Sequence, residues 1–147
     1  MDLSTVSTID KERLAKNPNT PEDVLRELAK DKDPWIRVQV AKNPSTPLDI
    51  LRELAKEDNW YVRAAVAQNP STPLDILRGL AKDDVDRVRY YVAKHPKGTS
   101  KLLLKMFEYE KSLRKPDGEV IRALYTHKNL PAFAKRVIET LFGEMLT

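Results

Sequence analysis

Cysteine is absent from this chain of 147 residues, and histidine occurs only twice. Without cysteine, a disulfide framework, a thiolate metal site and an iron–sulfur cluster are all excluded. Two histidines without a closely spaced cluster of carboxylates do not make a zinc site. We therefore predict no metal ion and no cofactor, and we expect a cytoplasmic location because a cysteine-free chain suits a reducing compartment.

Glycine and long apolar runs are also scarce. None of the four glycines belongs to a phosphate-binding loop, and no catalytic triad of serine, histidine and aspartate can be singled out. No apolar stretch is long enough to span a bilayer, and the first ten residues lack the basic and apolar regions of a secretion signal. The sequence thus predicts a protein that is not an enzyme and does not cross a membrane.

What the chain does contain is an internal repeat. The segment Asn-Pro-Ser-Thr-Pro-Leu-Asp-Ile-Leu-Arg occurs unchanged at Asn43–Arg52 and Asn69–Arg78, and a close relative begins at Asn17. This period of 26 residues is typical of a solenoid of stacked supersecondary units. We predict an all-α fold, an α-solenoid of two-helix repeats with an irregular C-terminal cap.

The first helix of each repeat is expected to follow a Thr-Pro pair, at Thr20, Thr46 and Thr72. Threonine can cap the free amide groups of a helix N-terminus, and proline at the first helical position loses no hydrogen bond. Apolar residues then recur at a spacing of three to four, which predicts one buried stripe on this helix. Its members are Val24, Leu25 and Leu28, then Ile50, Leu51 and Leu54, then Ile76, Leu77 and Leu80.

The second helix of each repeat is expected at residues 34–41, 60–67 and 86–93. Apolar residues four apart, such as Ile36 and Val40, predict a face that meets the first helix. The helix should end before an Asn-Pro or His-Pro step, because the residue before proline disfavours the α conformation. The asparagines at these steps either present a row of amides to a ligand or, as we favour, bond neighbouring backbone.

We expect one repeat domain over residues 1–147. Residues 1–16 form an N-terminal cap, residues 17–99 the regular repeats, and residues 100–147 a degenerate repeat with a C-terminal cap. In this last part, residues 101–113 and 132–145 are expected to be helical. His95 and His127 stand in or near the place of the repeat asparagine, which predicts a structural hydrogen bond rather than a metal ligand.

The second-helix sequences carry a family resemblance. Val62-Arg-Ala-Ala-Val-Ala-Gln-Asn-Pro-Ser-Thr-Pro73 resembles the unit of the leucine-rich repeat variant family, within the broader HEAT-like class. The likeness is close from Ala15 to Thr99 and loose beyond. It implies a right-handed superhelix of alternating helices and no single activity. Some members carry a cysteine-rich iron–sulfur segment, which a chain without cysteine does not have.

Arginine recurs at one position of the second helix, and two interpretations of it are open. The residues are Arg37, Arg63, Arg89 and Arg122. A ladder of guanidinium groups can follow the phosphates of a nucleic acid. We favour the alternative, in which these arginines pair with acids a few residues upstream, namely Asp33, Asp58 and Asp86.

The outer face of the second helices is the predicted binding surface for a macromolecular partner, most plainly a protein. Residues spaced three and four apart form this face: Trp35, Val38 and Lys42, then Tyr61, Ala64 and Gln68, then Arg87, Tyr90 and Lys94. From it we select five partner-binding residues: Trp35, Tyr61, Tyr90, Lys42 and Lys94. Aromatic and basic side chains are frequent energetic anchors of interfaces. The alternative is that Trp35 and Tyr61 only cover seams between repeats.

Nucleic-acid binding is the second hypothesis, because positive charge is concentrated in one region. Residues 87–128 hold 11 basic and 4 acidic side chains, whereas residues 1–86 hold 13 and 16. Such an excess can attract an acidic partner or DNA. The expected phosphate contacts are Arg87, Arg89, Lys94, Lys97, Lys101, Lys105 and Arg122. For either partner we expect the chain itself to be a monomer or to associate weakly.

Overall fold

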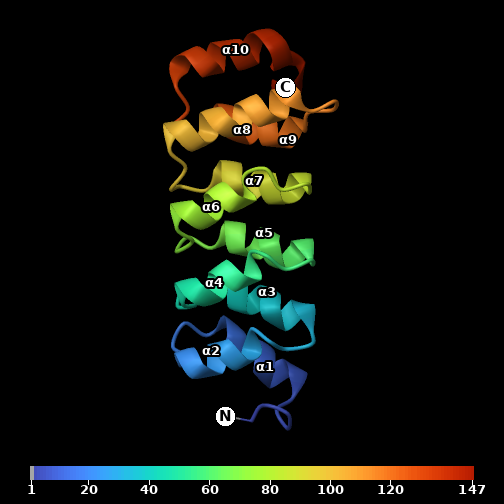
Figure 1. The fold of residues 1–147 in the computed structure, drawn as a ribbon, viewed down its shortest axis with the longest axis vertical. Coiled ribbons are helices and arrows are strands. Elements are labelled where there is room, and N and C mark those ends of the chain that lie inside the picture. The colour runs from blue at the N-terminus through green and yellow to red at the C-terminus, as the bar shows by residue number, and fades with distance from the viewer. Residues whose placement is uncertain (1) are drawn as a thin grey trace. The chain divides into compact units, whose positions relative to one another are not determined.

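The computed structural model describes residues 2–147, which contain ten α-helices, one 3₁₀-helix and no strand (Figure 1). The predicted all-α repeat fold is therefore confirmed. In chain order the helices are α1 Thr8–Lys16, α2 Glu22–Leu28, α3 Pro34–Lys42, α4 Leu48–Leu54, α5 Trp60–Gln68, α6 Leu74–Leu80, α7 Asp86–Lys94, α8 Ser100–Ser112, α9 Gly118–Thr126, α10 Ala132–Phe142 and the 3₁₀-helix η1 Gly143–Leu146.

The chain divides into two compact units, unit 1 at Met1–Ile76 and unit 2 at Leu77–Thr147. In unit 1, α1, α3 and α5 pack side by side, and the shorter helices α2 and α4 pack against them (Figure 1). In unit 2, α9 contacts α7, α8, α10 and η1. We call α1, α3, α5, α7 and α9 the second helices, and α2, α4, α6 and α8 the first helices.

The predicted apolar stripe forms the core. Leu25 and Leu51 of the first helices are fully buried, as are Ile36 and Val62 of the second helices. Burial of each such side chain contributes about 1.5–3 kcal/mol relative to leaving it in water. The second helices are regular α-helices of nine residues that each extend one residue past the expected end.

The predicted threonine caps are wrong. Helices α2 and α4 begin after the proline, and the hydroxyls of Thr20 and Thr46 point back to the preceding second helix. Thr20 Oγ1 donates to the carbonyl of Leu14 at 2.5 Å, and Thr46 Oγ1 donates to that of Val40 at 2.6 Å. The last carbonyls of a helix lack donors within the helix, so these buried hydroxyls satisfy them.

The repeat asparagines bond neighbouring backbone, as we favoured. Asn43 Nδ2 donates to the carbonyls of Ala15 at 2.8 Å and of Asn17 at 2.9 Å, both one repeat earlier. Asn43 Oδ1 accepts from the backbone N–H of Ser45 at 2.9 Å. Asn69 makes the corresponding bonds, and both side chains are buried. These amides are therefore unable to form an exposed row that reads a ligand.

His127 takes the place of the asparagine in unit 2. Its Nδ1 accepts from the N–H of Asn129 at 3.1 Å, which leaves the hydrogen on Nε2. Nε2 then donates to the carbonyl of His95 at 2.9 Å. His95 is buried as well, and its Nδ1 accepts from the N–H of Lys97. Both histidines thus hold the backbone where helices end.

This bonding predicts unequal effects of two substitutions. Asn43→Leu removes the donor for two buried carbonyls, and we expect the free energy of unfolding to fall by about 2–3 kcal/mol. His127→Asn keeps a donor and an acceptor, so its cost should stay below about 1 kcal/mol. Urea unfolding followed by circular dichroism measures both. Equal losses in the two variants would show that the amide does not act as the link.

Candidate interaction surface

Three large apolar side chains occupy one repeat position on the second helices of unit 1. Ile9, Trp35 and Tyr61 are each the second residue of their helix and are 71%, 51% and 60% exposed. We call these three residues the apolar row. Neighbouring packed helices lie about 8–10 Å apart, so the row extends over roughly 20 Å. Sequence reasoning missed Ile9 because residues 1–16 were considered only as a cap, although Ile9 precedes Trp35 by 26 residues.

Local bonds fix the backbone beneath the apolar row. Asp33 and Asn59 cap α3 and α5 by accepting hydrogen bonds at 2.9 Å from the N–H groups of Trp35 and Tyr61. The ring of Tyr61 stacks on Trp60, with centroids 3.9 Å apart and planes at 23°. The backbone that carries Trp35 and Tyr61 is therefore already ordered in the unbound protein.

Lysines lie at the opposite end of the same helices. Lys16 and Lys42 are the last residues of α1 and α3, and both are exposed. Lys16 pairs with Glu12 at 2.6 Å, and this hydrogen bond, aided by one from Trp35, lowers the pKa of Glu12 below its usual 4.5. Lys42 has no ion pair among the described residues. The second helices of unit 1 therefore carry the apolar row near their N-termini, and α3 carries the unpaired Lys42 at its C-terminus.

The middle of the predicted face is closed. Val38 and Ala64, which we placed on the outer face, are buried. The second helices of unit 1 pack directly on one another, and this covers the positions between the apolar row and the lysines. Trp35, Tyr61 and Lys42 remain accessible, so the surface is two separate rows.

In unit 2 the predicted residues Tyr90 and Lys94 contact each other instead of standing free. Lys94 Nζ lies 5.3 Å from the ring centroid of Tyr90 and 3.3 Å from its hydroxyl. The guanidinium of Arg87 lies 5.1 Å from the same ring, which is half-buried. Tyr90 is also not the counterpart of Trp35 and Tyr61, since that repeat position belongs to Arg87.

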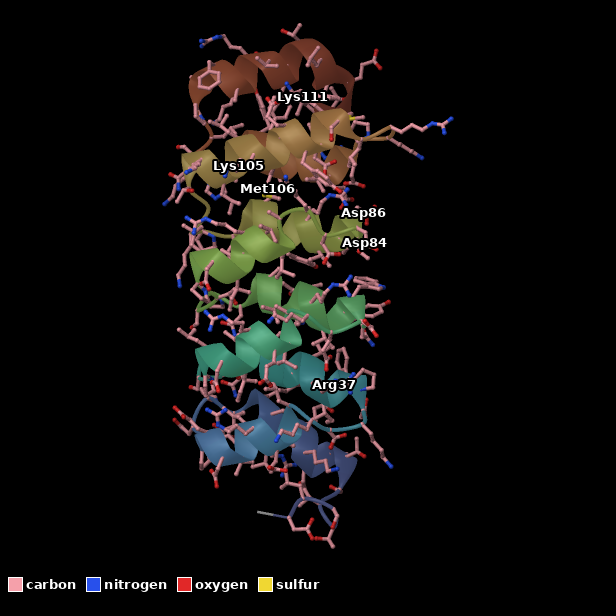
Figure 2. All side chains as sticks on the ribbon, viewed as in Figure 1. Arg37, Asp84, Asp86, Lys105, Met106 and Lys111 are labelled. Atoms are coloured by element: carbon pink, nitrogen blue, oxygen red, sulfur yellow. The ribbon has the colours of Figure 1, made fainter. Side chains whose placement is uncertain are left out.

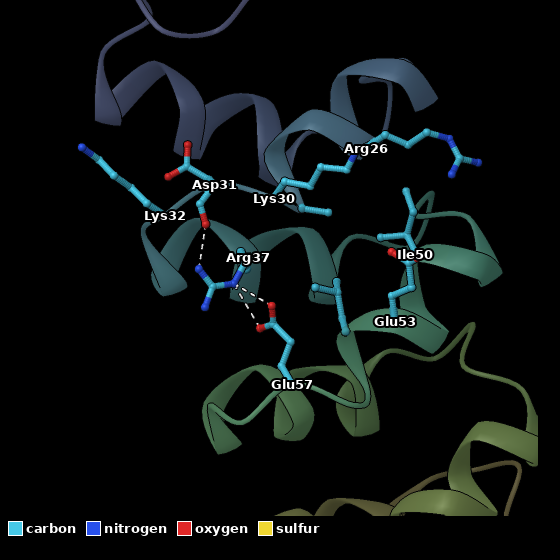
Figure 3. Close-up of a pocket in the computed structure, with 10 residues that line it drawn as sticks. Arg26, Lys30, Asp31, Lys32, Arg37, Ile50, Glu53 and Glu57 are labelled. Carbon is cyan, nitrogen blue, oxygen red and sulfur yellow. Dashed lines mark hydrogen bonds and ion pairs between the residues drawn. The ribbon is translucent and has the colours of Figure 1, made fainter.

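The four repeat arginines do bond within the protein, but the acid partners that we expected for them are wrong. Arg37 Nε pairs with the carboxylate of Glu57 at 2.9 Å, and its Nη1 donates to the carbonyl of Asp31 at 2.7 Å (Figure 3). Asp33 caps a helix instead. The guanidinium reaches the loop of the following repeat, where Glu57 lies 20 residues further along the chain.

The remaining arginines bond in two ways. Arg63 donates to the carbonyls of Glu57 and Asp58 at 2.8 and 2.9 Å. Arg89 pairs with Glu110 at 2.6 Å, where the two side chains are only 6% and 1% exposed. The upstream acids that we expected as partners, Asp33, Asp58 and Asp86, supply no carboxylate in these bonds.

The predicted nucleic-acid residues do not form one exposed surface in unit 2. Arg89 is buried, Arg87 pairs with Glu119 at 2.7 Å, and Arg122 donates to the carbonyl of Met145 at 2.6 Å. Lys94 belongs to a second helix, whereas Lys101 and Lys105 lie on the first helix α8, where Figure 2 labels Lys105. Lys97 lies in the loop between α7 and α8.

Ion pairs connect the first helices of successive repeats in unit 1. Arg26 Nη1 lies 2.6 Å from Asp49, and Arg52 Nη2 lies 2.8 Å from Asp75. These hydrogen bonds from arginine lower the pKa of both aspartates below the usual 3.8. A cavity of about 440 Å³ beside Arg26 is lined by four cations and three carboxylates (Figure 3). Its charged lining residues are Arg26, Lys30, Lys32, Arg37, Asp31, Glu53 and Glu57.

The family model of the leucine rich repeat variant matches residues 60–85, from the start of α5 to the residue before α7. This segment of 26 residues is similar to one unit of that family. The match confirms the resemblance seen in the sequence over one period of the leucine rich repeat variant. Comparison with curated proteins found no match, and neither did comparison with solved structures.

Metal-binding clusters and membrane-spanning helices are both absent from residues 2–147. No group of three histidine or acidic side chains in this range is placed to hold a metal ion. No helix in the same range is both long and apolar enough to cross a membrane.

The ion pair of Lys11 and Asp31 predicts a pH effect on unit 1. Burial raises the pKa of Asp31, but the bonds from Lys11 Nζ at 2.8 Å and from the N–H of Asp33 outweigh it, so the pKa lies below 3.8. A lowered pKa stabilises the fold above pH 3.8, and this stability is lost as the pH falls through the folded value.

Asp31→Asn should therefore flatten the acid limb of stability. Urea midpoints measured from pH 7 to pH 2 should differ most from wild type above pH 3.8 and converge below it. Lys11→Met should flatten the same limb, because it removes the main partner of the carboxylate. A variant curve that runs parallel to wild type over the whole range would contradict this assignment.

The buried pair of Arg89 and Glu110 predicts a large loss of stability in unit 2. Glu110→Ala leaves an unpaired charge in the interior, which costs about 3–5 kcal/mol. Glu119→Ala removes an exposed pair with Arg87 and should cost little, which makes it the matched control. Denaturant unfolding of both variants tests the difference, and a similar small loss in each would mean that Arg89 finds another partner.

Proposed function

We propose that this chain is a non-catalytic repeat scaffold that binds a protein segment on the second helices of unit 1. The observation that carries the proposal is the apolar row, in which Ile9, Trp35 and Tyr61 are more than half exposed. Exposed apolar side chains that occur singly need no explanation. Three at one repeat position on adjacent helices form an extended apolar strip, and such strips are typical of interaction sites.

The residue types and their rigidity favour a protein partner. Trp and Tyr provide much of the energy in protein interfaces because they bury large areas at a low entropy cost. The capped helix ends beneath Trp35 and Tyr61 reduce that cost further. A segment with apolar side chains spaced along the row, and an acidic side chain for Lys42, is complementary to this surface.

A non-catalytic role is consistent with the bonding of the titratable groups. His95 and His127 are buried and bonded to backbone at the ends of helices. Glu110, the most buried acid of unit 2, pairs with Arg89 and caps the N–H of Asp117. These groups are committed to structure, so we propose no catalytic residue.

Nucleic-acid binding through residues 87–128 remains the weaker candidate. Its support is the local excess of positive charge. Of its expected contacts, Arg87, Arg89 and Arg122 already bond to protein atoms. Affinity for duplex DNA that does not change with salt concentration would eliminate it.

A peptide-display selection on the intact chain tests the proposed function. Selected peptides should combine apolar and acidic residues. Their affinity should fall by at least about thirtyfold for the double variant Trp35→Ala, Tyr61→Ala, as expected on loss of interface anchors. Phe133→Ala is the control, because Phe133 is an exposed aromatic residue on α10, a helix of unit 2 that carries no residue of the apolar row.

Circular dichroism separates loss of binding from loss of fold. Both side chains are more than half exposed, so the double variant should unfold near the wild-type temperature. A collapse of thermal stability would identify Trp35 and Tyr61 as structural residues that cover seams. Equal loss of affinity in Phe133→Ala would show that the peptides do not recognise the row.

A further inference from the structure

The ion pairs that Arg26 and Arg52 form with an acid of the next repeat are not continued in unit 2, where a lysine replaces that acid. Arg26 pairs with Asp49 and Arg52 pairs with Asp75, each acid lying 23 residues after its arginine. The next arginine in this series is Arg78, and the residue 23 positions later is Lys101. This third position of the series therefore has two cations where the first two positions have an ion pair.

A second repeat position also changes from an acidic to a basic residue on α8. Glu27 and Glu53 occupy it in the first two repeats, and Gly79 and Lys105 occupy it in the next two. Two acidic positions of the repeat have thus become lysines on one helix, α8, one turn apart. Each change alone alters a single surface charge, but together they concentrate positive charge on the first helices of unit 2.

These cations surround a cavity of about 330 Å³ that lies within unit 2. We call it the cationic pocket. Its charged lining consists of Arg78, Lys82, Lys101 and Lys105, without a carboxylate. None of the four forms an ion pair with a described residue, and Lys82 only faces the ring of Tyr109 at 5.9 Å. The carboxylates that line the cavity beside Arg26 in unit 1 are therefore missing here.

The remaining walls of the cationic pocket add two properties. Ala81, Leu102 and Met106 form an apolar part of the lining, and Met106 follows Lys105 on α8 (Figure 2). Thr99 caps the N-terminus of α8, a helix of 13 residues whose dipole is positive at this end. The pocket thus joins four free cations and a helix N-terminus to an apolar surface.

We propose that the cationic pocket binds a small organic phosphate. A phosphate monoester carries about 1.5 to 2 negative charges near neutral pH and three acceptor oxygens, which suits a pocket lined by four cations. The cavity lies at the lower end of the size range of small-molecule sites, about 300–1,000 Å³. The apolar lining accommodates the organic part. This site lies in unit 2, on the first helices, and is independent of the proposed protein-binding surface.

The test uses phenyl phosphate as the probe and inorganic phosphate for comparison, titrated into the intact chain at constant ionic strength and followed by NMR. Lys101→Asp is the decisive variant, because it restores the residue type found at Asp49 and Asp75. It should weaken the binding of phenyl phosphate by about tenfold or more, as expected when a charge-assisted bond is replaced by repulsion. Its thermal stability should equal or exceed that of wild type, since the series of ion pairs is completed.

Lys128→Asp is the matched control, with the same change of charge at an exposed lysine outside the pocket. It should keep its affinity for phenyl phosphate within about twofold of wild type. Lys105→Glu, which introduces the residue type of Glu53, provides a second pocket variant if Lys101→Asp fails to fold. The double variant of Trp35 and Tyr61 should bind phenyl phosphate normally, so the two proposals fail separately.

Four results would overturn the proposal. One is that phenyl phosphate causes no saturable shifts at the pocket in wild type. Another is an equal loss of affinity in Lys101→Asp and Lys128→Asp, which would mean a response to net charge alone. Inorganic phosphate that binds as tightly as phenyl phosphate would exclude use of the apolar lining. Duplex DNA that displaces the probe at a lower phosphate concentration would assign the pocket to nucleic acid.

Discussion

The last carbonyls of a helix have no donor within that helix, and this protein supplies the donor from the chain that follows. Thr20 and Thr46 donate to the second helix just before them, and Asn43 donates to backbone one repeat earlier. These buried bonds allow little displacement, because a shift would leave carbonyls unsatisfied. They keep consecutive repeats in register at a spacing of 26 residues.

That register gives the surface its order. Residues 26 apart come to equivalent places on neighbouring helices, so Ile9, Trp35 and Tyr61 form one row within unit 1. The same register places Arg26 and Arg52 of unit 1 opposite an acid of the next repeat, Asp49 and Asp75. A substitution at one repeat position therefore also changes the surroundings of the side chains opposite it on the neighbouring repeat.

Departures from the repeat differ in their consequences. His127 replaces asparagine but keeps both a donor and an acceptor, so the backbone link survives. Lys101 replaces aspartate and removes a partner, which leaves Arg78 beside cations. The first departure preserves structure, whereas the second has no structural benefit visible in unit 2. We therefore expect a function at Lys101, where the departure removes a partner, rather than at His127, where it keeps one.

Helices and core could be predicted from the sequence because both depend on neighbours close in the chain. The spacing of Leu25, Leu28 and their equivalents indicates a buried stripe, and the Asn-Pro steps indicate where second helices end. Partners of polar side chains could not be predicted in this way. Threonine was expected to cap its own helix, and Arg37 was expected to pair with Asp33 rather than Glu57.

The sequence by itself determined the repeat, the all-α fold and the apolar stripe, since local spacing and composition are sufficient to specify them. Tertiary structure alone decided which predicted surface residues are accessible. Val38 is covered because second helices pack on one another, and Arg89 is buried because Glu110 meets it from α8. It also decided that four lysine and arginine side chains share one pocket. Such side chains lie up to 27 positions apart, so only folding brings their charges together.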